Sequence, residues 1–595
     1  MPRSELLRTA LPDVQSWWSE YGRPGWVANR WLFEEAPWVL AGHVRGTFRL
    51  DEPGRAPRRL IDPAGLGSFT PLSWYDSVRV QPGAGAATQG FGGAFVTVEG
   101  MSGHDVAPTR ATSGAEGVAD LRSGDGAWDE NSLMVSRRDT VSWLRIEAHG
   151  LTRGPAGTLD LAGRHVWQVD GGMRRGAHEL AVAYAAQGVG ATLLGTEQED
   201  TWAQVGSATY RWHARSGGAE LAFSRGRSRT ISYSEFFPLS RRASAASELS
   251  ARAWRSGFTG GIRYDREETA RDFADIFHAR ARSYWADGGW TGELGGGRLV
   301  VAVGAGKHDA FSTPEVAPSV SYEVGAGAIR ARVGAERVLN AVWSDLALVP
   351  GTHRTYAPFL QRTLLGVADV TIGTHYERQL RTWVLAGRTN SRAIASRTPL
   401  SEATLRRLEG LPVLQRGIAE DPDPYTFALV SAEGRMISES VPLLRSLPWL
   451  GRAFRPHRTS AWFGEAYGFG LVKPAQTVSP NVDPVIGGRA IVGGRWRLFQ
   501  GDLGIEAYGG GDFVGSRWSE FREYQLPGYG VSSLGLLFTL ADATITIRAR
   551  NLENRFRLEP WLDTSLNIDP NGPFAGEAVG PGREIRFALT LTLRN

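Results

Sequence analysis

The sequence contains no cysteine, and this absence excludes a disulfide framework, a thiolate metal site and a cysteine nucleophile. No run of about 18 apolar residues occurs anywhere in the chain, which excludes a transmembrane helix and leaves strands as the only way to cross a membrane. The 11 histidines are scattered and lack the His-x-x-x-His or Glu-x-x-His spacing of zinc and di-iron sites. We therefore predict no bound metal, no cofactor and no enzymatic activity.

Lysine is almost absent as well, because Lys307 and Lys473 are the only two and every other basic residue is arginine. Guanidinium groups suit bidentate contacts with phosphate, as on lipopolysaccharide or an anionic ligand, although base bias in the gene gives the same composition. The 66 basic and 62 acidic residues leave a formal charge of +4. Because this excess is spread along the chain, it does not predict a nucleic-acid partner.

A secretory signal is also missing, since Met1–Leu11 has no long apolar segment. A membrane barrel needs such a signal for export, so we expect a mature or shortened chain, or a start site placed too late. The 595 residues exceed what one soluble core usually holds, which leaves several domains or one large barrel.

Alternation of apolar and polar side chains is clearest at the C-terminus, in the sequence GREIRFALTLTLRN of residues 582–595. This period of two lasts as long as a tilted membrane strand requires, whereas a soluble edge strand usually ends after about five or six residues. We interpret the stretch as the closing strand of an outer-membrane barrel, which directs assembly, with a soluble edge strand as the alternative. Its apolar residues are Ile585, Phe587, Leu589, Leu591 and Leu593.

The same alternation returns in several hairpins with short turns. They cover residues 204–223, 320–336, 489–507 and 534–548. In the second hairpin Arg330, Arg332 and Glu336 form the charged side, which we expect to face a wet lumen. About 490 residues are available for such strands, and this suits the roughly 22 strands of a plugged transporter barrel.

The stretch Thr398–Pro456 departs from the strand pattern. Ser401–Leu411 and Val441–Leu450 have helical spacing, and several prolines interrupt the region. We expect a long outward loop or pair of loops around a strand near Tyr425–Val430, of the kind that often contacts a ligand.

The first hundred residues are richer in proline and lack repeated hairpins, which favours a compact mixed α/β domain. Leu6–Val14 has helical spacing, and Trp38–Val44 is a short strand candidate. The glycine-rich run Gly83–Gly100 does not fit a phosphate cradle, because no Gly-Lys-Ser/Thr follows it and no helix opens after it. Phe95–Val98 within this run predicts a strand instead.

The order of motifs in this region is specific enough to compare with a known family. In chain order they are SELLRTALPDV (4–14), WVLAGHV (38–44), LIDP (60–63), PLSWYDSVRV (71–80) and GFGGAFVTV (90–98). Together they resemble the plug domain of the TonB-dependent outer-membrane receptors, and NLENR (551–555) with PGRE (581–584) resembles that family's last two strands and the loop between them. The resemblance implies an all-β membrane protein with a small α/β plug domain, residues 1–101, in the lumen of an antiparallel transmembrane β-barrel. That barrel, residues 102–595, would have about 22 strands and long extracellular loops.

The sequence departs from the family at several positions. Ala41 stands in place of an aspartate, Arg79 in place of a carboxylate and Pro82 in place of an arginine, so we expect a weakened or rebuilt latch between plug and barrel. The segment Gly90–Gly93 is shorter than in the family, and no aromatic residue closes the chain. Because the match starts almost at Met1, we expect the upstream segment that the energising protein grips to be absent. The positions matched to the plug motif, for which the resemblance implies a structural or gating role, are Ala41, Gly42, Val78, Arg79, Val80, Gly83, Gly90, Gly92 and Gly93.

The resemblance also implies a function, namely energy-coupled uptake of a scarce solute across the outer membrane of a Gram-negative cell. Siderophore, cobalamin, haem and glycan ligands all remain open, and the ligand-binding residues are unknown. The implied partners are a small-molecule or oligosaccharide ligand, outer-membrane lipid and lipopolysaccharide, and an inner-membrane energising protein. The alternative is a transport-inert barrel that acts as a binding or scaffolding subunit of the envelope.

Overall fold

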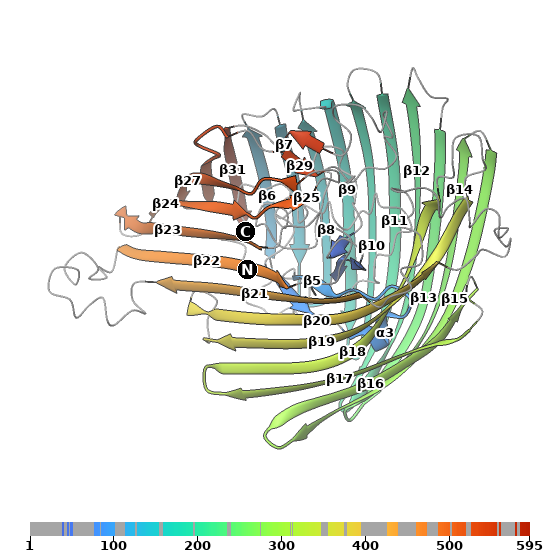
Figure 1. Ribbon diagram of the computed structural model, residues 1–595. Coiled ribbons are helices and arrows are strands. Elements are labelled where there is room, and N and C mark those ends of the chain that lie inside the picture. Colours follow the sequence, from blue (N-terminus) through green and yellow to red (C-terminus); the bar gives the residue numbers. More distant parts are fainter. Residues whose placement is uncertain are drawn as a thin grey trace.

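The structure is a computed structural model of the chain (Figure 1). It describes residues 38–40, 44–46, 48–51, 77–83, 85–101 and 114–594, the last range with gaps at 125–127, 154–158, 194–196, 235–239, 274, 310, 312, 347–354, 374–377, 394–424, 438–459, 473–485, 500–501, 519–524, 556–557, 561–576 and 580–582. The predicted helix at Leu6–Val14 and the motif residues Ala41 and Gly42 lie outside the described residues.

The main element is a closed antiparallel barrel of 22 strands, which confirms the predicted fold class. Its neighbours follow chain order, and the last strand pairs with the first, so the sheet has no free edge. The strands are β6 (Gly114–Gly124), β7 (Trp128–Arg138), β8 (Ser142–Arg153), β9 (Leu159–Arg175), β10 (His178–Leu193), β11 (Glu197–Ala214), β12 (Gly217–Ser234), β13 (Ser240–Arg255), β14 (Phe258–Phe273), β15 (Asp275–Leu294), β16 (Gly297–His308), β17 (Glu315–Ala326), β18 (Ile329–Leu346), β19 (Thr355–Ile372), β20 (Leu380–Ala393), β21 (Tyr425–Ile437), β22 (Ser460–Val472), β23 (Ile486–Leu498), β24 (Leu503–Val514), β27 (Tyr529–Leu540), β28 (Ala543–Arg550) and β31 (Glu584–Arg594).

Alternation of side chains along each strand gives the barrel an apolar outside and a polar inside. On β31, Ile585, Phe587 and Leu593 point outward and are more than 40% exposed, whereas Arg586 and Thr590 point inward and are buried. Such an apolar outer face over a closed, fully hydrogen-bonded sheet is what a strand protein needs in lipid. No helix among the described residues is long and apolar enough to cross a membrane.

The predicted hairpins are confirmed in both pairing and facing. Tyr210 pairs with Leu221 across the β11–β12 turn, and Leu536 pairs with Ile547 across the β27–β28 turn. β6 begins and β31 ends at the same end of the barrel, and most turns at that end are only two or three residues long. The short ones are residues 139–141, 176–177, 215–216, 256–257, 295–296, 327–328 and 541–542. We call this the short-turn end and the opposite one the outer end, because short turns face the periplasm in outer-membrane barrels.

For Thr398–Pro456 the sequence predicts a strand near Tyr425–Val430 with outward loops around it, and the structure confirms the strand. β21 crosses the whole wall between β20 and β22, so residues 394–424 and residues 438–459 join strands at opposite ends of the barrel. The second connection therefore leaves from the short-turn end, and the two are not both outward loops. The predicted helical stretches themselves lie outside the described residues.

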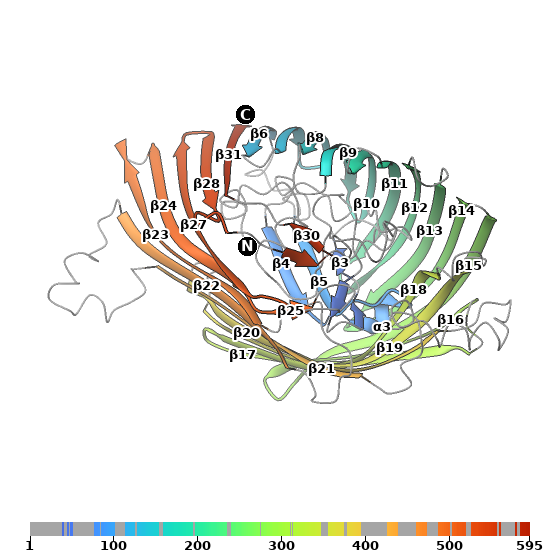
Figure 2. The same cartoon turned by 45° about the horizontal axis from the view of Figure 1, so that its top comes forward.

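A small sheet lies inside the barrel, as Figure 2 shows for the blue strands within the ring. It contains β3 (Phe48–Asp51), β5 (Val96–Met101) and β4 (Ser77–Pro82), in that order. β5 is the strand expected after the glycine-rich run. Inside that run, however, is a four-residue helix, α3 (Ala86–Gln89), which the sequence did not reveal.

Three further strand pairs are short. Trp38–Val44 was expected to be one strand, but Trp38–Leu40 (β1) and Val44–Gly46 (β2) pair with each other as two antiparallel strands. Two pairs do not belong to the sheet of the barrel: Arg517–Trp518 (β25) pairs with Gln525–Leu526 (β26), and Leu558–Pro560 (β29) pairs with Glu577–Val579 (β30).

The motifs NLENR and PGRE meet at the outer end, where they begin and end the connection between β28 and β31. Arg583 donates its backbone N–H to Asn554 Oδ1 at 2.8 Å and a side-chain N–H to the carbonyl of Leu552 at 3.0 Å. Glu553 accepts hydrogen bonds from the hydroxyl and the backbone N–H of Ser532, and these lower the pKa of Glu553 to about 2. These hydrogen bonds therefore tie the two ends of the β28–β31 connection to each other and to β27.

The outward position of Leu536, which is 40% exposed, gives a test of the membrane-facing surface. A Leu536→Arg substitution is expected to lower the free energy of unfolding from lipid vesicles by about 2–4 kcal/mol if the residue lies near the bilayer centre. Thr539→Arg on the inward side of β27 is the matched control and should cost much less. Equal losses in denaturant titrations of the two variants would contradict the assignment of faces.

Candidate functional site: contacts between the inner segment and the barrel wall

The candidate site lies where residues 77–83 and 85–101, here called the inner segment, meet the inward side chains of the wall. Val78 and Val80 on β4 are buried, at 2% and 5% exposure, whereas Arg79 between them is exposed. The segment passes from β4 through α3 to β5, and the contacts below attach it to β14, β15, β18 and β20.

Three wall arginines donate hydrogen bonds to backbone carbonyl groups of the inner segment. Arg381 Nη1 on β20 lies 2.8 Å from the carbonyl oxygen of Val80. Arg332 on β18 donates to the carbonyl of Pro82, and Arg263 on β14 donates to that of Gln89. In these three contacts the charged group belongs to the wall, and the inner segment supplies a backbone acceptor.

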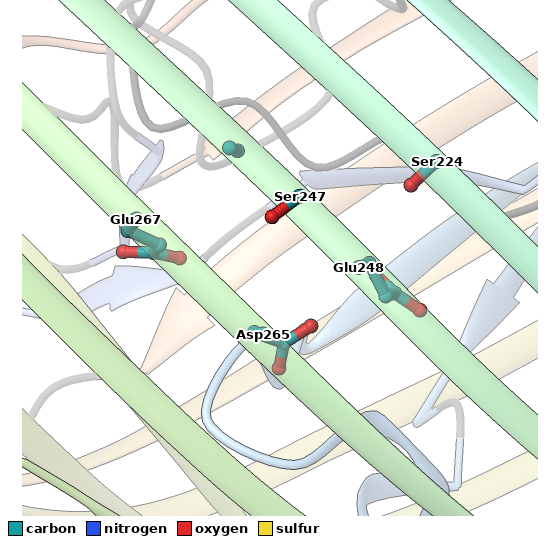
Figure 3. Close-up of a pocket in the computed structure, with 6 residues that line it drawn as sticks. Ser224, Ser247, Glu248, Asp265 and Glu267 are labelled. Carbon is teal, nitrogen blue, oxygen red and sulfur yellow. The ribbon is translucent and has the colours of Figure 1, made fainter.

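Two of these arginines are also held by wall carboxylates. Arg381 makes a bidentate contact with Asp369 on β19, at 3.0 and 2.7 Å. Arg263 lies 3.4 Å from Asp265 and 4.0 Å from Glu248 on the neighbouring strand β13. Figure 3 shows Asp265 and Glu248 beside Glu267, Ser247 and Ser224 on the adjacent strands. Bidentate and charge-assisted contacts of this type fix the direction of a guanidinium group.

Two wall side chains hold the first two residues of the short helix α3. Glu336 Oε2 on β18 accepts the backbone N–H of Ala86 at 2.8 Å, which satisfies a donor that a helix N-terminus leaves unpaired. The indole N–H of Trp285 on β15 donates to the carbonyl of Ala87 at 2.7 Å. Both wall side chains are buried, so water does not compete freely for these bonds.

Backbone pairing extends the contact beyond α3. Gly92 and Asn340 on β18 form an antiparallel bridge, and on either side of it Gly93 N–H donates to Leu339 and Ala341 N–H donates to Phe91, each at 2.7 Å. A Cβ atom on Gly93 would lie 2.4 Å from Val338 Cγ1 and 2.9 Å from the backbone oxygen of Leu339. Only glycine therefore allows the backbone to approach the wall this closely.

Phe91 anchors the same stretch in an apolar cluster. Its ring packs edge-on to Trp285 at 5.4 Å between centroids and against Phe311 at 6.2 Å. Ala317, Leu339 and Leu360 complete the buried group. Burying an aromatic side chain of this size contributes about 1.5–3 kcal/mol. A second apolar contact between the inner segment and the wall is made by Phe95, whose ring centroid lies 5.7 Å from that of Phe427 on β21.

By sequence, the chain matches no family model and no curated protein. By structure, it is similar to a mutant of the ferric enterobactin receptor PfeA from Pseudomonas aeruginosa, with a TM-score of 0.68 at 11% identity over 100% of this chain and 98% of the other. The siderophore receptor PirA from Acinetobacter baumannii gives a TM-score of 0.68 at 9% identity, over 100% and 98% of the two chains. The copper transporter OprC gives 0.67 at 11% identity, over 98% and 95%.

The closed barrel, the sheet inside it and the similarity to these solved structures all indicate the same fold. The chain has the fold of the TonB-dependent outer-membrane receptors. A closed barrel with this fold and an apolar outer face indicates the outer membrane as its location.

Within this receptor fold, most residues matched to the plug motif lie at the wall contact. Val80 O, the Gly92 bridge and Gly93 N take part directly. Gly83 and Gly90 have positive φ angles of 62° and 63° and lie against Val367 and Arg263, respectively. Their gating role stays a prediction.

The sequence did not single out the wall residues that contact the inner segment. Arg332 and Glu336 were assigned to the lumen by their alternation, but Arg263, Trp285 and Arg381 carried no signal beyond that same alternation. No group of three His, Asp or Glu side chains in the described part of the chain is arranged to hold a metal ion. What this site provides is a non-covalent attachment of one part of the chain to another.

Removal of the Glu336 carboxylate tests this attachment. Glu336→Ala leaves the Ala86 N–H without its acceptor, at a cost of about 1–3 kcal/mol. Amide hydrogen exchange in a peptide covering residues 85–94 should then become about tenfold to a hundredfold faster.

The matched control is Glu506→Ala, which removes another buried wall carboxylate, one that pairs with Arg495 at 2.7 Å. It should leave exchange in residues 85–94 unchanged. Unchanged exchange in Glu336→Ala would show that the carboxylate does not hold α3.

Proposed function

We propose that this protein is an outer-membrane receptor that takes up a scarce solute by energy-coupled movement of its N-terminal part. In this proposal residues 1–101 are the plug domain, residues 102–595 are the barrel, and an inner-membrane protein supplies the energy from the periplasmic side. The fold and the coarse class of the structural neighbours support uptake, while the individual solute is a separate question.

The observation that carries the proposal is the way charge is distributed at the wall. Arg381 and Arg263 pair with carboxylates of the wall, Asp369 and Asp265, and these carboxylates do not belong to the inner segment. Moving the segment away therefore breaks hydrogen bonds to backbone carbonyls but leaves neither guanidinium group without a counter-charge. A buried charge left without its partner would instead cost several kcal/mol.

The strength of the individual contacts suits stepwise release. Each hydrogen bond between a wall side chain and the backbone contributes about 0.5–1.5 kcal/mol net, or somewhat more with a charged donor. Water entering the lumen replaces these bonds one at a time, so a pull on the inner segment meets a series of small barriers. Together with the Phe91 cluster, the same contacts keep the plug in place at rest.

The solute belongs to one of the classes that such receptors take up, namely siderophores, cobalamin, haem or glycans. The neighbouring structures are described as receptors for ferric enterobactin or other siderophores and as a copper transporter. Growth of a deletion strain on single iron, cobalt-corrin or glycan sources would identify the class for this chain.

The alternative is a transport-inert barrel with a binding or scaffolding role in the envelope. Two expectations from the sequence support this alternative: Ala41, Arg79 and Pro82 replace charged latch residues of the family, and the segment that the energising protein grips is expected to be absent. In this protein the barrel wall supplies the charged contacts to the inner segment, through Arg263, Arg332 and Glu336. A latch rebuilt in this way favours the transport function over the inert one.

A reversible covalent lock tests whether the plug must move. The pair Gly92→Cys and Asn340→Cys replaces two directly bridged residues, whose Cα separation of about 4.5–5.5 Å in an antiparallel pair suits a disulfide. The chain has no cysteine of its own, so no other thiol interferes. Uptake of the solute identified by growth should stop in the oxidised double variant and return on reduction.

Each single cysteine variant is the control and should transport in both redox states. Purified protein in a planar bilayer should also conduct little while the plug is folded. Undiminished uptake by the oxidised double variant, or a large steady conductance of the unaltered protein, would favour the inert barrel or an open pore.

A further inference from the structure

The outward surface of β12–β15 changes character at one level of the barrel wall. Phe223, Leu249, Tyr264 and Tyr284 lie side by side in register on the four consecutive strands. All four side chains belong to the outward set, and the rings of Tyr264 and Tyr284 are 5.2 Å apart. Tyrosines at this position are typical of the boundary between the apolar band and the polar headgroups.

Two residues closer to the outer end, the same four strands present Arg225, Ser247, Arg266 and Arg282, again directly in register. The next outward positions add further basic residues on β12 and β15. We call this group the outer basic patch, and it consists of Arg225, Arg227, Arg229, Arg266, Arg280 and Arg282. The patch begins where the apolar band ends and lies on the outside of the barrel.

The charge of the patch is only partly balanced within the chain. Glu268 pairs with both Arg266 and Arg280, with its Oε1 at 3.0 and 2.7 Å from their Nε atoms. Arg266 and Arg282 are directly opposite each other, and like charges in that position destabilise a sheet. Among the described residues, no carboxylate forms an ion pair with Arg225 or Arg282.

The arginines of the outer basic patch are separated by a strand with small side chains, and one of them is held by an aromatic ring. β13 contributes only small outward side chains at this level, Ala243, Ala245 and Ser247, between the arginines of β12 and those of β14 and β15. Strands are spaced by about 4.8 Å, so Arg225 and Arg282 stand roughly 15 Å apart across the sheet. Arg227 lies over the ring of Trp202, 5.3 Å from its centroid, which fixes that guanidinium group.

We propose that the outer basic patch binds the phosphorylated headgroup of lipopolysaccharide in the outer leaflet. A headgroup seated there has its acyl chains against Phe223, Leu249 and the two tyrosines, and its phosphates against the arginines. Guanidinium groups bind phosphate with bidentate, charge-assisted hydrogen bonds. The proposal depends on the membrane location of the barrel and not on solute uptake.

The test compares two double variants of the full chain, each purified in non-ionic detergent and freed of lipid. Arg225→Gln with Arg282→Gln removes two arginines of the patch. Arg175→Gln with Arg255→Gln is the matched control, because both are exposed arginines on the outward side at the short-turn end. We expect the dissociation constant for purified lipopolysaccharide to rise at least tenfold in the first variant and to stay within twofold in the control.

Two further arms use the unaltered protein and so do not depend on how a variant folds. Enzymatically dephosphorylated lipopolysaccharide should bind at least tenfold more weakly, and inorganic phosphate should compete only at much higher concentration than the lipid. Equal binding by the two double variants, equal binding of the dephosphorylated lipid, or equally strong binding of inorganic phosphate would each overturn the proposal. None of these results bears on uptake, which the disulfide lock measures separately.

Discussion

Closure of the sheet is the constraint on which the rest of this structure depends. In lipid every backbone N–H and C=O must find a partner within the protein, and a sheet achieves this only when its last strand pairs with its first. Here β31 makes that pair with β6, from Arg586 and Gly124 to Arg594 and Glu116. Because side chains alternate along a strand, closure also divides them into an outer apolar set and an inner polar set.

The inward polar side chains pair with one another, and some of them also hold the inner segment. Wall arginines and carboxylates pair with one another across neighbouring strands, as Arg381 does with Asp369, and some of them also hold the backbone of the inner segment, as Arg381 does at Val80. Charge therefore remains with the wall, while the segment contributes carbonyl groups, a buried phenylalanine and glycines that allow close approach. Two of the arginines that hold the segment, Arg381 and Arg263, therefore have their counter-charges in the wall itself.

The polarity of the outward side chains changes along the strands. At the level of Phe223 and Tyr264 the outward side chains are apolar or aromatic, and two residues further along they become Arg225 and Arg266. Strands β12–β15 have 16 to 20 residues, whereas about 9–11 residues suffice to cross the apolar layer. The additional length brings the basic residues out of that layer, to the depth where lipid phosphates are found.

The sequence by itself determined the period of two, the hairpin pairs such as Tyr210 with Leu221, the closing strand and, through its length, the size of the barrel. These are local properties, because a strand's pattern and a short turn fix which residues face the same side and which residues pair. Only the tertiary structure decided which inward residues meet the inner segment. Arg263 and Gln89 are 174 positions apart, and Arg263 resembles every other inward arginine until the ring closes around the segment. The four-residue helix at Ala86–Gln89 was likewise set by its partners Glu336 and Trp285, since a helix that short is not stable alone.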